Sequence, residues 1–92
     1  MRVEVSDQVI AYVKGLPPEP RRALRHAIRK LEGPRGDIRK LEGSLSNHQR
    51  LRVGYHRIIF QRVPSESGPL LRCIFAQHRS VVYTMMEEIL QR

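Results

Sequence analysis

The chain has 92 residues, of which 17 are lysine or arginine and nine are aspartate or glutamate, so its formal net charge is +8 at pH 7. This length accommodates a single domain, residues 1–92, with a modest core, and 40% hydrophobic residues is typical of a soluble globular protein. No apolar run approaches the roughly 20 residues of a membrane span, so no membrane partner is expected. Cys73 is the sole cysteine, which excludes an internal disulfide and favours a cytoplasmic location.

The first half of the chain is predicted to hold one strand and two helices. Residues 2–5 alternate as a short strand, and Ser6 fits the N-cap of a first helix. A second helix is predicted to begin near residues 18–20, where proline is tolerated in the first turn, and to end at Gly33 and Pro34. Two antiparallel helices are therefore expected.

The second half is predicted to consist mainly of strands. The segment 37–41 is consistent with a further short strand, and a hairpin follows at 49–62. Residues 70–76 alternate as another apolar strand, and a last helix begins near Arg79 or Ser80. On that strand Leu71, Cys73 and Phe75 are predicted to share one face. Consecutive strands mostly pair as antiparallel neighbours, so the helices are expected to cover one face of the sheet and leave the other open.

The hairpin segment 49–62 is the most informative part of the chain. It alternates as a strand, breaks at Gly54 and Tyr55, and alternates again. A two-residue loop that starts with glycine is typical of a tight hairpin and places Arg52 opposite Arg57, and directly opposed residues share a sheet face. One face is predicted to carry Arg50, Arg52, Arg57 and Gln61, with Ile59 as its one apolar member. The opposite, core-side face is predicted to carry Leu51, Val53, His56, Ile58 and Phe60.

Three arginines with no acidic neighbour predict a site for an anion, most simply phosphate, because like charges side by side destabilise a sheet. Of the 17 basic residues 14 are arginine, whose planar fork holds phosphate through two donors. A basic field of this kind favours RNA, DNA or an acidic protein partner. A GC-rich genome also enriches arginine codons, so composition alone leaves the function open.

Three segments in a fixed order carry a resemblance to a known family. They are Lys40-Leu41-Glu42-Gly43, Arg50-Leu51-Arg52-Val53-Gly54-Tyr55-His56-Arg57-Ile58-Ile59-Phe60 and His78-Arg79-Ser80-Val81-Val82-Tyr83. Across almost its whole length the chain resembles the RelE/ParE superfamily of bacterial type II toxins. The resemblance implies an α+β fold, with two N-terminal antiparallel helices packed on a curved, mainly antiparallel four-stranded sheet and a short C-terminal helix.

The resemblance also implies two alternative activities. RelE-like members cut messenger RNA in the ribosomal A site without a metal, whereas ParE-like members poison DNA gyrase, and both are neutralised by an antitoxin encoded beside them. The expected function is a RelE-like mRNA endoribonuclease that needs no metal or cofactor and is held by an acidic antitoxin. The alternatives are a ParE-like gyrase inhibitor without catalysis, and an inactive member that acts only in a complex.

The RelE-like basic site falls on three arginines of the hairpin, Arg50, Arg52 and Arg57, which the resemblance implies for both RNA binding and catalysis. Tyr83 matches the family's C-terminal tyrosine, and His78 and Arg79 match a histidine–arginine pair of many members. The chain departs from the family at Arg50 and Arg52, where RelE-like enzymes tend to carry lysine, and at His56, where a tyrosine is frequent. It also departs near Gln77, where well-known RelE-like sites carry an arginine, and this last departure favours the alternatives without nuclease activity.

Metal-free RNA cleavage needs a base for the 2′-OH, cations for the phosphorane and an acid for the leaving 5′-oxygen. The three hairpin arginines suit charge stabilisation but not proton abstraction, because the pKa of arginine exceeds ~12. The base is therefore sought among His48, His56, His78 and Tyr83. His78 is preferred because it lies at the predicted strand–helix junction beside Arg79, where that arginine is expected to bind RNA. His56 is expected to be a structural residue on the core side.

Overall fold

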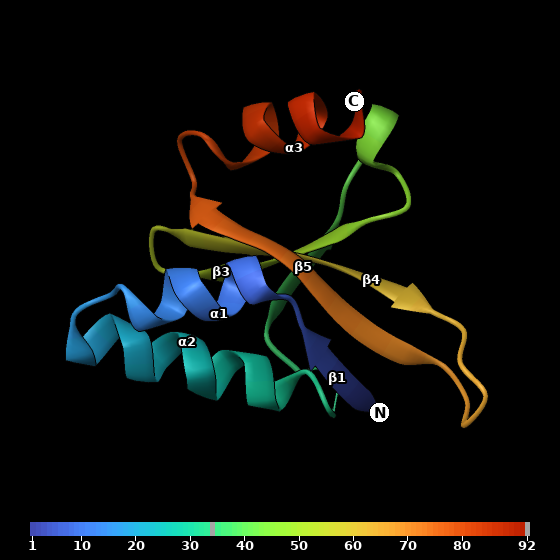
Figure 1. Cartoon of the computed structure of the whole chain (residues 1–92), viewed down its shortest axis with the longest axis horizontal. Helices are drawn as coiled ribbons and strands as arrows, with labels where there is room; N and C mark the ends of the chain where they lie inside the picture. The colour runs from blue at the N-terminus through green and yellow to red at the C-terminus, as the bar shows by residue number, and fades with distance from the viewer. Residues whose placement is uncertain (34, 92) are drawn as a thin grey trace.

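The computed structural model describes residues 1–33 and 35–91, so Pro34 of the expected helix stop lies outside the described residues. The elements are β1 (Arg2–Val5), α1 (Asp7–Lys14), α2 (Pro18–Lys30), β2 (Asp37–Lys40), a 3-10 turn η1 (Gly43–Leu45), β3 (Gln49–Val53), β4 (His56–Val63), β5 (Leu70–His78) and α3 (Val82–Leu90). The α+β class and the order of elements are confirmed (Figure 1).

Within the described residues the sheet has five strands in the order β1-β5-β4-β3-β2, so the prediction of four strands is wrong. The pair of β1 and β5 is parallel and the other neighbouring pairs are antiparallel. The two short strands, β1 and β2, lie at opposite edges of the sheet. Four residues give too short a pattern to separate an edge strand such as β2 from a loop, which is why the sequence leaves it undecided.

Buried side chains of the described residues form one cluster on each face of the sheet. The larger cluster packs α1 and α2 against the sheet and includes Val9, Leu24, Leu51, Ile58 and Phe60. The smaller cluster packs α3 against the other face and consists of Leu45, Ile59, Phe75, Val82 and Met86. Figure 1 shows α3 on the opposite side of the sheet from α1 and α2. The expected open face is therefore partly covered by α3.

A β-bulge in β5 explains a second difference from the sequence prediction. Cys73 and Phe75 pair with consecutive residues of β4, so Ile74 between them is an extra residue that reverses the alternation. Leu71 and Cys73 consequently lie in the core beneath α1 and α2, whereas Phe75 lies on the other face, beneath α3. The prediction from simple alternation, which placed all three side chains on one face, is therefore wrong for Phe75. Burial raises the pKa of the Cys73 thiol to about 12, so this cysteine is a protonated core residue.

Two side chains at the start of α1 extend the hydrogen bonding of β1 along β5. Ser6, which caps α1 as predicted, donates its hydroxyl to the carbonyl of the bulged Ile74 at 3.1 Å. The Gln8 amide donates to the Ala76 carbonyl at 2.7 Å and accepts from the Ala76 N–H at 2.7 Å. These bonds satisfy backbone groups that a longer β1 would have paired. They fix the segment of β5 that leads to His78.

Candidate arginine-rich site

The hairpin of β3 and β4 has the predicted register. Arg52 lies opposite Arg57, and Arg50 lies opposite Ile59. The turn holds Gly54 at φ +59°, a conformation that glycine adopts at little cost. The register places Arg50, Arg52 and Arg57 on one face of the sheet, the face that α3 partly covers, and we call these three side chains the arginine face.

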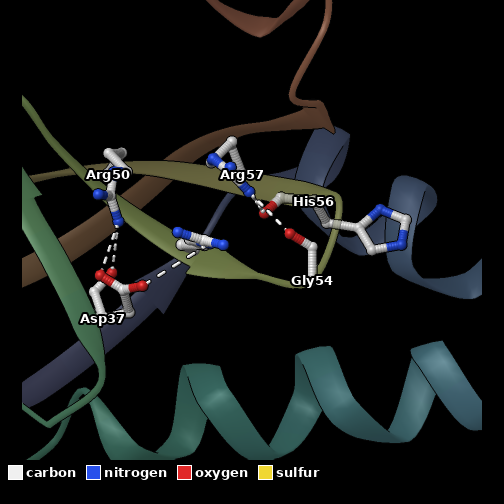
Figure 2. Close-up of polar contacts among 6 residues, drawn as sticks. Asp37, Arg50, Gly54, His56 and Arg57 are labelled. Carbon is white, nitrogen blue, oxygen red and sulfur yellow. Dashed lines mark hydrogen bonds and ion pairs between the residues drawn. The ribbon is translucent and has the colours of Figure 1, made fainter.

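Asp37 of β2 lies against two residues of the arginine face, so the expectation that these arginines have no acidic neighbour is wrong. Arg50 Nη1 donates to Asp37 Oδ1 at 3.0 Å and to the Asp37 carbonyl at 2.9 Å, and Arg52 Nε lies 3.8 Å from Asp37 Oδ2 (Figure 2). The hydrogen bond from Arg50 lowers the pKa of Asp37, so this carboxylate stays ionised to a lower pH than an ordinary aspartate. An incoming anion would therefore compete with the Asp37 carboxylate for Arg50 and Arg52.

Arg57 is fixed by the turn that precedes it. Its Nη1 donates to the carbonyls of Gly54 at 3.0 Å and His56 at 2.9 Å (Figure 2). A guanidinium has five N–H donors, and these two bonds use only Nη1. No hydrogen bond among the described residues engages its Nε–Nη2 edge, and that edge has the two-donor geometry that matches phosphate.

A pocket of about 330 Å³ joins the arginine face to α3. Arg50 and Tyr83 line it together with Arg39, Lys40 and Glu87. The Arg50 side chain is only 13% exposed, so the pocket holds this cation in a partly desolvated position where its charge acts more strongly than in water. The structure therefore places Tyr83, from the end of the chain, on the same pocket as an arginine of the hairpin.

His78 occupies a different position from the arginine face. It is paired with His56 across β4 and β5, whereas Gln77 is paired with Arg57. Paired residues share a face, so the Cα–Cβ bond of His78 points toward the α1 side of the sheet, as that of His56 does. The exposed His78 ring accepts the Ser80 N–H at Nδ1 (3.1 Å), with the Ser80 hydroxyl 2.8 Å away. The neutral ring therefore carries its hydrogen on Nε2.

No family model matches the chain, and no curated protein matches it. Solved structures do match its fold. The YoeB/ParE toxin from Agrobacterium tumefaciens matches with a TM-score of 0.69 at 15% identity, over 85% of this chain and 98% of the other. The archaeal RelE–RelB complex from Pyrococcus horikoshii OT3 matches with a TM-score of 0.64 at 26% identity, over 85% and 93%. The toxin–antitoxin complex RelBE2 from Mycobacterium tuberculosis matches with a TM-score of 0.67 at 16% identity, over 85% and 96%.

The chain therefore has the fold of the RelE/ParE toxins. The resemblance drawn from the three sequence segments is confirmed, and those segments become β2 with η1, the β3–β4 hairpin, and the β5–α3 junction. Among the departures from the RelE-like pattern, Gln77 has the clearest structural consequence. It lies beside Arg57 on the arginine face, so glutamine stands where a further cation is expected from the RelE-like pattern.

His56, another departure from the RelE/ParE pattern, lies on the core side as predicted. Its Nδ1 is 2.7 Å from the Tyr12 hydroxyl, and Figure 2 shows its ring pointing away from the arginines. Burial lowers the pKa of His56, and the neighbouring His78 and Arg57 lower it further. His56 therefore stays neutral in the folded protein at a pH where the unfolded chain would protonate it.

We expect the protein to lose stability as the pH falls below about 6.5, the ordinary pKa of histidine. Above that pH, His56 is neutral in both states and contributes nothing to the pH dependence. Below it, the unfolded state binds the proton more readily, so the free energy of unfolding decreases until the pH passes the lower folded pKa. Urea unfolding between pH 5 and 7 measures this slope.

His56→Gln should make that slope shallower, because glutamine does not titrate but keeps a partner for Tyr12. His26→Gln, at an exposed position of α2, is the matched control and should leave the slope unchanged. A slope that persists in His56→Gln would assign the pH dependence to another group.

The remaining candidate base, His48, is buried, with only 7% of its surface exposed. Its Nδ1 has no hydrogen-bond partner among the described residues, and little of the ring is open to a ligand.

Within residues 1–33 and 35–91, no three histidine, cysteine or acidic side chains cluster in a way that could hold a metal ion. No helix in the same part of the chain is long and apolar enough to cross a membrane.

Proposed function

We propose that this chain is the toxin of a toxin–antitoxin pair and acts as a RelE-like, metal-independent mRNA endoribonuclease on the ribosome. One observation carries the proposal: Tyr83 and Arg50 line a single pocket at the edge of the arginine face. A proton-transfer group beside a partly desolvated cation is what cleavage through the 2′-OH requires. The likeness to the archaeal RelE–RelB complex from Pyrococcus horikoshii OT3 supports the toxin assignment.

The proposed chemistry divides the side chains by what each can do. Arg50 and the Nε–Nη2 edge of Arg57 stabilise the extra charge on the phosphorane, and Arg52, which is 54% exposed, binds the flanking phosphate. Tyr83, which lines the pocket together with Arg50, is the group that moves a proton in this proposal. His78 ends β5 on the α1 side of the sheet, so the proposed chemistry does not use it as the base expected from the sequence.

We propose an acidic antitoxin as the partner that neutralises the toxin. Asp37 already places a carboxylate against Arg50 and Arg52, so acidic side chains from another chain can meet the same donors. A disordered acidic segment that orders on a basic surface would cover the arginine face and exclude RNA from it.

The second candidate is ParE-like inhibition of DNA gyrase without catalysis. The observation that favours it is Gln77 beside Arg57, because an uncharged side chain there leaves the arginine face one cation short of the RelE-like pattern. An inactive member that works only within a complex is favoured by the same residue.

We expect induction of this chain alone in bacteria to stop growth, and co-expression of the antitoxin encoded beside it to restore growth. Messenger RNA on translating ribosomes should be cut to fragments with a 2′,3′-cyclic phosphate and a 5′-OH, since the 2′-oxygen is the proposed nucleophile. End-mapping of the RNA measures both ends. Uncut RNA together with inhibited supercoiling by gyrase would replace the first candidate by the second. Full growth at high soluble expression would leave only the inactive member.

A further inference from the structure

The tip of the β3–β4 hairpin carries an exposed aromatic side chain that the proposed chemistry does not use. Tyr55, the second residue of the turn, is 63% exposed, the largest fraction among the exposed large hydrophobic side chains described. Such exposure leaves most of its surface in contact with water, at a position that makes no contribution to either core cluster. Most of the ring surface is therefore available to a ligand or partner.

Two planar groups from the β5–α3 junction already lie against Tyr55. The His78 ring is nearly parallel to it, with an interplanar angle of 18° and centroids 6.1 Å apart, which is an offset-stacked arrangement. The Arg79 guanidinium carbon lies 5.0 Å from the Tyr55 ring centroid, within the range of a cation–π contact. Planar side chains from two segments that are distant in sequence thus gather at one tip.

The tip is held in a fixed shape by backbone bonds. The Arg79 N–H donates to the Tyr55 carbonyl at 2.8 Å. Arg57 Nη1 bonds the carbonyls of Gly54 and His56, the residues on either side of Tyr55. Because the main chain around Tyr55 is bonded on both sides, its ring is presented without the entropy cost of ordering a loose loop.

We propose that Tyr55, with His78 and Arg79 beside it, is a stacking platform for a base of single-stranded RNA whose backbone runs over the arginine face. Aromatic and guanidinium planes are the groups on which proteins stack unpaired bases, and a basic surface beside them tracks the phosphates. The tip lies about 10 Å along β3 from Arg50, so the stacked base belongs to a different nucleotide from the one at the Tyr83 pocket. This inference rests on the proposed function for RNA as the ligand.

The test uses the full chain and a short single-stranded RNA that carries 2-aminopurine, whose fluorescence falls when the base stacks. Loss of one stacked base lowers affinity about 5- to 150-fold. We expect Tyr55→Ala to weaken binding by this factor and to abolish the quenching, and Tyr55→Phe to keep both. The slope of log affinity against log salt should be unchanged in Tyr55→Ala, because no charge is lost. In Arg52→Ala, the control for a phosphate contact, the slope should fall by about 0.7.

Tyr55→Ala should unfold at the same urea concentration as the parent, since the ring is exposed. Binding and quenching that survive in Tyr55→Ala would overturn the platform and leave the proposed function standing. A parent protein that binds no single-stranded RNA would also overturn it, and the growth and ribosome experiments would then decide the proposed function separately. If Tyr55→Ala captures the antitoxin more weakly but binds RNA as the parent does, the tip belongs to a protein partner instead. If Tyr55→Ala loses the stacking of the base and the parent protein cuts no RNA, the platform stands and the nuclease is rejected.

Discussion

Replacing Tyr83 by phenylalanine is expected to slow cleavage of mRNA on translating ribosomes by about 10²–10⁴-fold, the range that a general acid or base contributes. The change removes one hydroxyl from the pocket shared with Arg50 and leaves the ring and its packing in place. Ribosome binding should change by less than about threefold, because the hydroxyl is proposed to act in the transition state. Single-turnover cleavage and co-sedimentation with ribosomes measure the two quantities.

Tyr12→Phe is the matched control, since it removes a hydroxyl on the opposite side of the sheet, where its partner is His56. Its cleavage rate should match that of the parent. His78→Ala tests the catalytic role expected from the sequence: a loss as large as that of Tyr83→Phe would return His78 to the mechanism. If either variant loses less than about threefold in cleavage rate, its residue is excluded from the mechanism.

Replacing Phe75 by alanine is expected to reduce the free energy of unfolding by about 3–5 kcal/mol, the usual cost of a large aromatic side chain removed from a core. Phe75 is 6% exposed and packs with Val82 and Met86 of α3. Because the cluster beneath α3 is small, the loss should fall mainly on the attachment of that helix. Amide exchange in α3 should therefore accelerate, and cleavage should decline with it, since α3 carries Tyr83.

Phe60→Ala is the comparison variant, because Phe60 is 1% exposed and lies in the cluster beneath α1 and α2. Its unfolding free energy should fall by a similar amount, measured by urea unfolding, while the amides of α3 keep their protection relative to global unfolding. Equal acceleration of α3 exchange in both variants would show that the two clusters unfold as one unit.

The hairpin was predictable residue by residue, because a two-residue loop with glycine first leaves one register for alternating strands. Arg52 accordingly lies opposite Arg57, and His56 lies on the core side. The acidic neighbour was not predictable from the same pattern. Asp37 meets Arg50 only because β2 pairs with β3, and a four-residue edge strand carries almost no periodicity of its own.

The position of His78 was missed for a different reason. Strand alternation counted from the hairpin gives no information about the register between β4 and β5, which a bulge at Ile74 shifts. Pairing with His56 then turns His78 away from the arginines that it was expected to assist. The tip residue Tyr55 was overlooked because a turn residue shows no pattern, and its contacts with Arg79 and His78 appear only in three dimensions.

The amide of Gln8 has a consequence for association between copies of the chain. β5 runs for nine residues, whereas its neighbour β1 covers only four of them, so an unprotected stretch of sheet edge would remain beyond β1. Such an edge is a template for a strand from another molecule and a starting point for aggregation. Gln8 occupies both backbone groups of Ala76, and Ser6 occupies the carbonyl of Ile74. Two short polar side chains thereby close this edge to foreign strands without the length of chain that a longer β1 would need.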